Sequence, residues 1–325
     1  MNNRVRLLRL IADGEFYSGE KLGHALGVSR AAIWKIINSL SRYGLTIVAV
    51  KGKGYRLSRS IEFLDKQSLL SRIRSPAFKI LNELEIFEEI DSTNKYLLES
   101  PEISDKHACV ILAEYQTQGR GRRGNPWISP PGSGISLSIA WHFEQPVESL
   151  TCLSLAAGSA VIRVLTTMGF DGIGLKWPND IFFQGKKLGG LLIEIRGETA
   201  GPCDVVIGLG LNYDFPVDFK GNIKQPWIDL VSIKDSTASR NYIAAELISE
   251  MMLLLETYAN INIEDIINEW QQYDCMRGKK ARLKLQGKNI HGLVVGIDND
   301  GALLMSVDNR IQKYTAGEIS LRVES

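Results

Sequence analysis

The stretch Glu114-Tyr-Gln-Thr-Gln-Gly-Arg-Gly-Arg-Arg-Gly-Asn-Pro-Trp127 does most to decide the fold of this chain. Its centre, Gly119–Gly124, matches the pattern GxGxxG, which in dinucleotide-binding proteins opens a helix whose N-terminus holds a pyrophosphate. Here arginines fill the gaps, and the following Asn-Pro-Trp and Ser-Pro-Pro-Gly-Ser-Gly predict a loop rather than a helix. A glycine-rich basic loop of this kind suits a phosphate or a carboxylate. A solvated basic loop or an RNA-binding patch is the alternative.

Two further charged segments follow this loop. Lys176-Trp-Pro-Asn-Asp180 precedes Lys186-Lys-Leu-Gly-Gly190, and Gln184-Gly185 between them predicts a hairpin turn. Asp180 and Lys187 then lie on the two arms of one hairpin, which would bring a carboxylate and an ammonium together at the mouth of a sheet. An ordinary surface salt bridge is the alternative.

Two weaker signals flank these segments. In Asp91-Ser-Thr-Asn94, either Ser92 or Thr93 can cap a helix. Gly208-Leu-Gly-Leu-Asn212 predicts a buried strand that ends in a polar side chain. Because Ser/Thr caps are common, neither segment identifies a site without the others.

The first sixty residues predict three helices and a hairpin. Helical spacing and capping residues place the helices at 4–13, 18–26 and 29–43, and a basic turn joins two short strands at 46–50 and 55–57. A tight turn at Gly27-Val28 joins the second and third helices, as in a helix-turn-helix. The basic hairpin resembles the wing of a winged helix.

The charge of the chain is unevenly distributed. Residues 1–60 contain 11 Lys/Arg and 3 Asp/Glu, a balance of +8, whereas the other 265 contain 27 and 34, a balance of −7. A basic end on an acidic body suggests that nucleic acid binds at that end.

Composition indicates an ordinary globular protein of two or three domains, with 44% hydrophobic and 23% charged residues in a length of 325. The apolar runs, such as Leu188–Ile195, fall short of the ~20 residues that cross a membrane. No signal peptide is expected from the N-terminus. The cysteines and histidines lie outside the motifs, so reduced cysteines and a cytoplasmic protein are expected; these residues are Cys109, Cys152, Cys203, Cys275, His24, His107, His142 and His291.

The rest of the chain predicts an α+β fold with a mixed sheet. Ile135, Leu137, Ile139 and Trp141 alternate with small or polar residues, which indicates a half-buried strand. Strands are expected at 188–195 and 205–211, and helices at 150–168, 239–258 and 263–273. Five short strands after residue 276, at 281–285, 290–297, 302–307, 311–314 and 319–323, predict a small SH3-like barrel.

Taken together, the glycine-arginine loop with Trp127, the KWPND segment and the KLGG segment resemble one family in order and spacing: the bifunctional biotin–protein ligases, known also as biotin operon repressors. Gly317–Arg322 resembles the tail motif of this family. The resemblance covers nearly the whole chain. It implies a winged helix-turn-helix at 1–62, a linker at 63–80, a class II synthetase-like ligase domain at 81–275 and an SH3-like β-barrel at 276–325.

The resemblance implies two half-reactions. The biotin carboxylate attacks the α-phosphate of ATP, with Mg²⁺, and a lysine of a biotin carboxyl carrier protein then attacks the resulting adenylate. Cations are needed because the first step brings two anions together. Lys187, Arg122 and Asp180 are the expected catalytic residues, with Asp180 orienting or deprotonating the acceptor lysine.

The resemblance also assigns binding residues. Those expected to bind biotin are Ser92, Thr93, Asn94, Gln116, Gly119, Arg120, Arg122 and Lys187. Those expected to bind the nucleotide are Arg122, Arg123, Trp127, Lys176, Asn179, Asn212, Trp227 and Arg322, although ordinary packing is the alternative for Asn212 and Trp227. No residues are assigned to a metal.

The N-terminal domain is expected to bind operator DNA as a homodimer when the adenylate is bound. The residues expected to contact DNA are Ser29, Arg30, Ala31, Trp34, Lys35, Lys51 and Lys53. Three alternatives stay open: a regulator that senses biotin without ligase activity, a ligase whose N-terminal domain has lost DNA binding, and a lipoate ligase. The presence of Lys187 and the arginines argues against the first, the basic N-terminal domain against the second, and the arginine-rich loop with the winged helix against the third.

Overall fold

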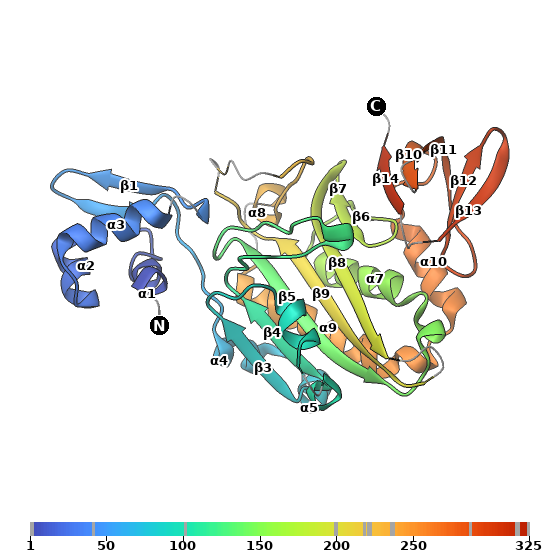
Figure 1. The fold of residues 1–325 in the computed structure, drawn as a ribbon, viewed down its shortest axis with the longest axis horizontal. Coiled ribbons are helices and arrows are strands. Elements are labelled where there is room, and N and C mark those ends of the chain that lie inside the picture. Colours follow the sequence, from blue (N-terminus) through green and yellow to red (C-terminus); the bar gives the residue numbers. More distant parts are fainter. Residues whose placement is uncertain are drawn as a thin grey trace.

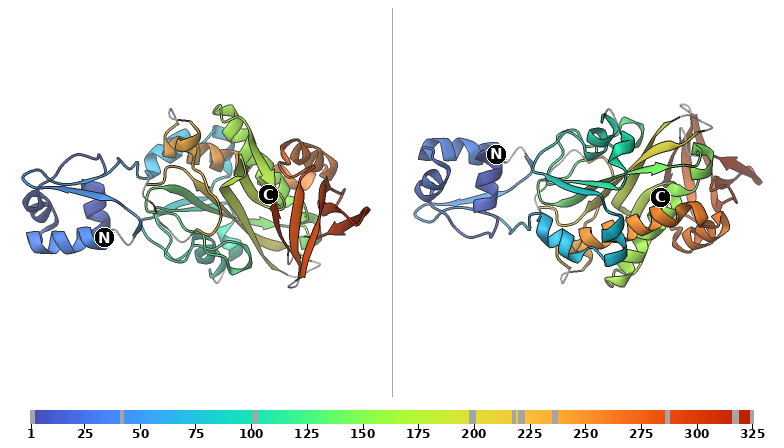
Figure 2. Two further views of the ribbon diagram at one scale, coloured as in Figure 1. Left: turned by 90° about the horizontal axis from the view of Figure 1, so that it is seen from above. Right: turned by 90° about the horizontal axis from the view of Figure 1, so that it is seen from below.

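The computed structural model describes residues 3–40, 43–100, 103–197, 201–216, 219, 223–234, 238–285, 288–315 and 319–323. A helical N-terminal part, a central seven-stranded sheet and a C-terminal five-stranded sheet follow one another along the chain (Figure 1). Figure 2 shows the N-terminal part at one end of the central body and the C-terminal strands at the other. The predicted α+β class is confirmed.

The N-terminal part is the predicted winged helix. Its elements are α1 (Asn3–Leu10), α2 (Gly19–Leu26), α3 (Arg30–Leu40), β1 (Ile47–Val50) and β2 (Gly54–Leu57). Ser18 caps α2 by accepting a hydrogen bond from the backbone N–H of Lys21, and Gly27 ends it with a φ of 68°. Ser29 Oγ accepts from the N–H of Ala32 at the start of α3. The three helices enclose a small apolar core of their own.

The sequence predicts a helical linker over residues 63–80, and the structure corrects this in one respect. The segment is helical, forming α4 (Lys66–Arg72) and α5 (Ser75–Ile80). However, Leu69, Ile73 and Ala77 are buried in the core of the central domain, because both helices pack against α9 (Arg240–Thr257). The segment therefore packs as part of that domain.

The central sheet has the strand order β3-β4-β5-β9-β8-β7-β6. Its strands are β3 (Glu83–Phe87), β4 (Cys109–Ala113), β5 (Gly134–Phe143), β6 (Ile173–Lys176), β7 (Asp180–Phe183), β8 (Lys186–Gly197) and β9 (Cys203–Asn212). Strands β3 and β4 are parallel, and every other neighbouring pair is antiparallel. The sheet is therefore mixed, as predicted.

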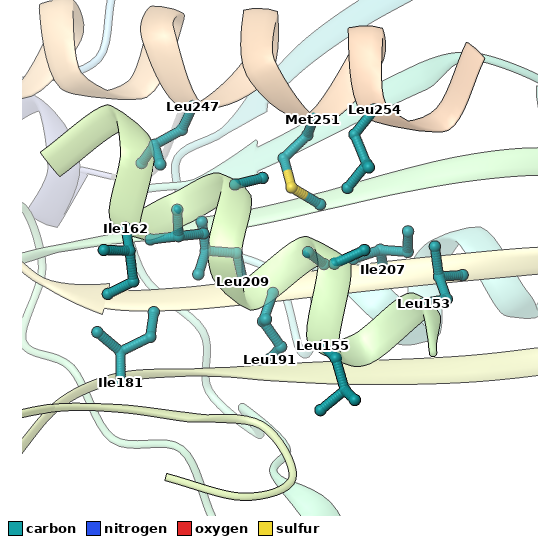
Figure 3. Packing of buried hydrophobic residues seen from close by; sticks show 14 of the residues in the cluster. Leu153, Leu155, Ile162, Ile181, Leu191, Ile207, Leu209, Leu247, Met251 and Leu254 are labelled. Atoms are coloured by element: carbon teal, nitrogen blue, oxygen red, sulfur yellow. The ribbon is translucent and has the colours of Figure 1, made fainter. Parts of the chain in front are cut away.

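Helices cover both faces of this sheet. Helix α7 (Leu153–Thr167) and helix α9 lie on one face, where Leu155, Met251 and Leu209 belong to the same apolar cluster (Figure 3). Helix α10 (Ile263–Tyr273) packs against α7. The short α6 (Thr93–Leu98) packs against β5 and β9 with the opposite face of the sheet, in a smaller cluster.

The prediction that β5 is half buried was wrong. Residues of both alternating sets are buried, and His142 alone in this strand is partly exposed. Ile135, Leu137 and Ile139 belong to the larger core, whereas Ser138 lies against α6 and is fully buried. The polar members of the alternation therefore face the covered side of the sheet rather than solvent.

The C-terminal sheet contains the five predicted strands. They are β10 (Lys280–Leu285), β11 (Lys288–Ile297), β12 (Leu303–Val307), β13 (Arg310–Tyr314) and β14 (Ile319–Val323), in the antiparallel order β13-β12-β11-β10-β14. The turn before β12 packs on the central domain, where the indole Nε1 of Trp177 donates to the carbonyl of Gly301 at 3.0 Å. This contact joins the C-terminal sheet to the KWPND segment.

One helical stretch, Val147–Thr167, is long and apolar enough to cross a membrane by length and composition, with a mean hydropathy of 1.5. It contains α7, and 72% of the apolar window is buried inside the protein. A helix buried to this extent between a sheet and other helices is a core helix.

Candidate functional site

Small side chains line the face of the central sheet opposite α7. The register aligns Ser138 with Gly208, and Ser136 with Gly210, across β5 and β9. Gly190 of β8 pairs in turn with Gly210. Since side chains alternate along a strand, these residues share one face and leave room above it. A floor of small residues of this kind admits either a ligand or side chains from other segments.

Two side chains lie directly on this floor. A Cβ added to Gly208 would lie 2.1 Å from Asn94 Oδ1, and one added to Gly210 would lie 2.4 Å from the ring of Trp127. Both glycines are therefore required by the close approach of these side chains. Trp127 Nε1 is buried and has no hydrogen-bond partner among the described residues. An unpaired buried donor indicates that a ligand acceptor completes the site.

The polar end of the floor gathers residues predicted to bind the biotin ring. Ser92 caps α6 by accepting from the N–H of Lys95, which fixes the next two residues at the start of the helix. The backbone N–H of Thr93 donates to Gln116 Oε1 at 2.9 Å. Asn94 Nδ2 donates to Glu194 Oε2 at 2.8 Å. The structure thus brings together segments that are far apart in sequence.

The charged end lies on the hairpin of β7 and β8. Lys187 Nζ is 2.5 Å from Asp180 Oδ1, and Lys176 Nζ is 3.8 Å from Asp180 Oδ2. The turn at Gln184-Gly185 has positive φ at both residues, 47° and 78°, as a tight hairpin requires. The predicted approach of Asp180 and Lys187 is confirmed.

Side chains around this pair are arranged closely. A Cβ on Gly190 would lie 3.2 Å from Asp180 Oδ1 and from Lys187 Nζ, so the second glycine of KLGG leaves room for the pair. Both charged side chains are mostly buried, with exposed fractions of 17% for Lys187 and 18% for Asp180. Lys187 Nζ also lies 5.7 Å from the centre of the Trp127 ring. A cation held at this depth interacts strongly with an anionic ligand because solvent screening is reduced.

The glycine-arginine loop lies over β8 and places its first two arginines at the two ends of the floor. Arg120 Nη2 contacts Glu194 Oε2 at 3.2 Å, beside Asn94. Arg122 Nη1 donates to Asn179 Oδ1 at 3.3 Å, beside Asp180. Burial lowers the pKa of the Arg122 guanidinium, and the nearby Asp180 carboxylate partly offsets this. Arg122 remains a cation, because the guanidinium is not deprotonated in proteins.

The conformation of this loop is that of a turn. Arg122–Gly124 forms a single 3₁₀ turn in which Arg123 has a φ of 59°. Gly119 allows close approach, because a Cβ there would lie 2.4 Å from the carbonyl oxygen of Trp127. The expectation of a loop rather than a dinucleotide-binding helix is confirmed. Arg123 is exposed.

Three predicted nucleotide-binding residues have other roles in this structure or lie outside its description. Asn212 Nδ2 donates to the carbonyls of Lys187 and Ile228, which ties segment 226–228 to β8. Trp227 packs on Phe215, with ring centres 4.8 Å apart. The backbone of Arg322 pairs with Arg282, and its side chain lies outside the described residues.

A second candidate surface lies on the winged helix. All seven residues predicted to contact DNA are exposed, namely Ser29, Arg30, Ala31, Trp34, Lys35, Lys51 and Lys53. Trp34 is 57% exposed, whereas Ile33 and Ile37 of the same helix are buried. Helix α3 thus turns its apolar face inward and presents its N-terminal polar face, as a recognition helix does.

Sequence reasoning missed Ser138, Glu194 and the spacing role of Gly208. The signals were present: Ser138 lies within an apolar alternation, and Glu194 interrupts the apolar run of β8. Ser138 reads as a solvent-facing position if β5 is taken as half buried. Only the packing of α6 on this face shows otherwise.

A winged helix joined to a mixed-sheet domain, with charged side chains beside glycine-rich strands, is the arrangement expected of a ligase that carries a DNA-binding domain. The family matches agree: residues 4–56 match an HTH domain, residues 86–212 the biotin/lipoate A/B protein ligase family, and residues 278–322 the biotin protein ligase C terminal domain.

Similarity to known proteins covers almost the whole chain. The chain is 38% identical over 319 residues to the bifunctional ligase/repressor BirA of Escherichia coli strain K12, which covers 98% of this chain and 97% of that protein. It is 39% identical, with the same coverage, to the protein of that name from Salmonella typhimurium. A solved biotin protein ligase from Aquifex aeolicus, in complex with biotin and ATP, superposes with a TM-score of 0.64 at 26% identity, covering 75% of this chain and all of that one. The chain belongs to the bifunctional ligase/repressor family of biotin–protein ligases.

Proposed function

We propose that this protein activates biotin with ATP and transfers it to a specific lysine of a biotin carboxyl carrier protein. In the first step a biotin carboxylate oxygen bonds to the α-phosphorus, and the bond to the leaving pyrophosphate breaks. In the second step the acceptor lysine nitrogen attacks the carbonyl of biotinyl-5′-AMP, AMP leaves, and the lysine loses a proton. The observation that carries the proposal is the Lys187–Asp180 pair at one end of a glycine floor whose other end gathers Thr93, Asn94 and Gln116.

The residues at the two ends fit the two halves of biotin. The ring end offers amide, hydroxyl and backbone groups that are mostly buried, as a neutral ureido ring requires. The other end offers cationic groups for a carboxylate and a phosphate. The ring of Trp127 lies over Gly210 and 5.7 Å from Lys187 Nζ, and its unpaired Nε1–H is available to donate a hydrogen bond to a ligand.

Three residues would act on the reacting atoms. Lys187 would reduce the repulsion between the carboxylate and the α-phosphate and stabilise the charge that develops on phosphorus. Arg122 would close over the adenylate from the loop and hold its phosphate. Asp180 holds Lys187 in place, and its second oxygen, Oδ2, faces Lys176 at 3.8 Å. In the second step this carboxylate would orient the incoming lysine.

The remaining assignments belong to the same proposal. Ser92, Gly119 and Arg120 would complete the biotin pocket, and Arg123, Lys176, Asn179, Asn212, Trp227 and Arg322 the nucleotide side. Mg²⁺ would enter with ATP. Among the residues that the structure describes there is no group of three or more His, Cys, Asp or Glu that could hold a metal ion, and we assign no ligands to it.

We further propose that the adenylate-bound protein is a homodimer that binds an operator and represses transcription. The protein would act in the cytoplasm. The exposed α3 face and the basic wing support DNA binding. A single winged helix makes few contacts, so specific binding favours two copies on paired half-sites. Strand β3 ends the central sheet on one side and would offer an edge at which two copies pair. On the other side, Leu175 of β6 already pairs with Asp274 and accepts from the N–H of Cys275.

Labelled biotin, MgATP and an apo-carrier domain test the ligase function, with lipoate as a parallel arm. We expect label on the carrier with biotin and none with lipoate. Transfer of lipoate alone would indicate a lipoate ligase. Binding of biotin without pyrophosphate release would indicate a sensor.

A further inference from the structure

A continuous chain of hydrogen bonds runs from Glu194 to the ring pocket, by which we mean Thr93, Asn94 and Gln116. Asn94 Nδ2 donates to Glu194 Oε2 at 2.8 Å, and Asn94 Oδ1 lies 2.6 Å from Ser138 Oγ. Ser138 Oγ lies 2.7 Å from Thr93 Oγ1. The three middle members are almost fully buried, with exposed fractions of 4%, 0% and 3% for Asn94, Ser138 and Thr93. At this depth every donor must meet an acceptor.

The Glu194 carboxylate, together with the backbone carbonyl of Leu192, determines how the Asn94 amide is oriented. The amide nitrogen lies between Glu194 Oε2 and the carbonyl oxygen of Leu192, at 2.8 Å and 3.1 Å. An ionised carboxylate and a carbonyl can only accept hydrogen bonds. The NH₂ group of Asn94 must therefore face them, and its oxygen must face Ser138.

The direction of the remaining bonds follows from counting hydrogens. Ser138 has one hydroxyl hydrogen, and the amide oxygen of Asn94 can only accept it. Ser138 Oγ therefore accepts from the hydroxyl of Thr93 at 2.7 Å, which is the shorter of the two contacts of that hydroxyl; the other is with Gln116 Oε1 at 3.3 Å. Because the single hydrogen of Thr93 goes to Ser138, Thr93 Oγ1 has a lone pair left as an acceptor for a ligand.

Gln116 is fixed independently and supplies the complementary donor. The backbone N–H of Thr93 can only donate, and it meets Gln116 Oε1 at 2.9 Å. The Gln116 NH₂ group therefore lies on the other side, where a Cβ on Gly119 would be 3.4 Å from it. The pocket thus presents an acceptor at Thr93 and donors at Gln116.

We propose that Glu194 is a positioning residue that sets the direction of this hydrogen-bond chain and so matches the pocket to a cyclic urea. A ureido ring has N–H donors for the Thr93 acceptor and a C=O acceptor for the Gln116 donors. This inference rests on the proposed function, because it concerns how that pocket selects its ring. Glu194 does not touch the ligand in this account; it acts through Asn94 and Ser138.

The surrounding residues hold Glu194 and Asn94 in this arrangement. Gly208 leaves the space that Asn94 occupies, since a Cβ there would lie 2.1 Å from its Oδ1. Arg120 contacts the same Glu194 oxygen from the loop at 3.2 Å. Glu194 therefore connects the loop to the ring pocket as well as orienting it.

The test compares Glu194→Gln with wild type on biotin and on 2-iminobiotin, in which an imino group replaces the ureido oxygen. Pyrophosphate release gives KM and kcat for each. We expect the KM for biotin to rise about ten-fold, as loss of a hydrogen bond to a charged group predicts, while kcat changes less than about three-fold. The preference for biotin over 2-iminobiotin should fall at least about five-fold. An amide at 194 can turn either its oxygen or its NH₂ group toward Asn94, which leaves the more distant Leu192 carbonyl as the remaining fixed acceptor.

Glu83→Gln is the matched control, because Glu83 pairs with Lys106 at 2.9 Å on the β3 edge of the same sheet. It should retain wild-type KM and preference. An unchanged KM and preference in Glu194→Gln would overturn the proposal. A wild-type protein that releases no pyrophosphate with biotin would instead refute the proposed function, and this inference with it.

Ser138→Ala provides an independent variant if Glu194→Gln does not fold. It removes the hydroxyl oxygen that accepts from Thr93 and should also reduce the preference for biotin. Ser159→Ala is its control, since Ser159 is fully buried in α7 and its hydroxyl has no partner among the described residues. Equal losses of preference in the two serine variants would show a packing effect and overturn the proposal.

Discussion

Replacing Lys187 by alanine should nearly abolish adenylate formation while the fold is retained. The ammonium of Lys187 is mostly buried and is 2.5 Å from Asp180 Oδ1. Two unit charges about 4 Å apart interact by about 4 kcal/mol at an effective dielectric constant of about 20. Removing one donor to a developing oxyanion costs about 3–4 kcal/mol in enzymes of known mechanism, so a decrease of roughly 100- to 1,000-fold in rate is expected. Without Lys187, Asp180 keeps only the more distant Lys176 as a cationic neighbour within 4 Å among the described ion pairs, which adds to the loss.

The assay is pyrophosphate release with biotin and MgATP, with Lys186→Ala as the control, because Lys186 is the exposed neighbour on the same strand. Lys186→Ala should be close to wild type. Supplying preformed biotinyl-5′-AMP with apo-carrier should restore much of the transfer by Lys187→Ala, since the adenylation step is then bypassed. Pyrophosphate release by Lys187→Ala within a few-fold of wild type would refute the role given to this ammonium.

Three further predictions concern the loop, the wing and the dimer. Arg122→Gly should release biotinyl-5′-AMP about ten-fold faster, because the loop loses its contact with Asn179; an unchanged off-rate in stopped-flow would contradict a lid role. Replacing both Lys51 and Lys53 by alanine should weaken operator binding while biotin transfer is unchanged. The slope of the logarithm of the binding constant against the logarithm of the salt concentration should decrease in magnitude by about 0.9 for each lost phosphate contact. An unchanged slope would show that the wing does not contact DNA. Biotinyl-5′-AMP should increase the dimer association constant in sedimentation equilibrium, because an ordered loop lowers the entropy cost of pairing, and apo-carrier should compete with operator binding; failure of either effect would disprove the proposed switch.

The local rules of helix and turn formation determined much of this structure. Ser18 and Gly27 place the ends of α2 because one supplies a capping oxygen and the other tolerates a positive φ. Gln184-Gly185 forms the predicted hairpin turn with a positive φ at both residues, and that turn, with a shift of register between Ile181 and Phe182, brings Asp180 to Lys187. These features depend on residues close in sequence, so the sequence is sufficient to predict them.

The order and spacing of the charged motifs also identified the family. Binding a phosphate and a carboxylate requires cationic side chains, and it requires glycines where the backbone lies close to the ligand. What the sequence could not decide was which face of each strand is covered. Ser138 and Glu194 interrupt apolar patterns, and a polar residue at such a position indicates solvent unless another element packs there. Helix α6 does pack there. Ser138 is fully buried against it, and Glu194, whose side chain is 27% exposed, is joined to the ring pocket through Asn94.

The same limit explains the segment 63–80. Its sequence predicts helices correctly, but whether they connect two domains or belong to one depends on α9, more than 160 residues later, against which they pack. The sequence by itself determined the local elements, the cations and the family of this protein. Only the tertiary structure decided which polar residues meet beneath the loop, because hydrogen-bond partners such as Glu194 and Asn94 are chosen by the register and packing of strands and helices that are distant along the chain.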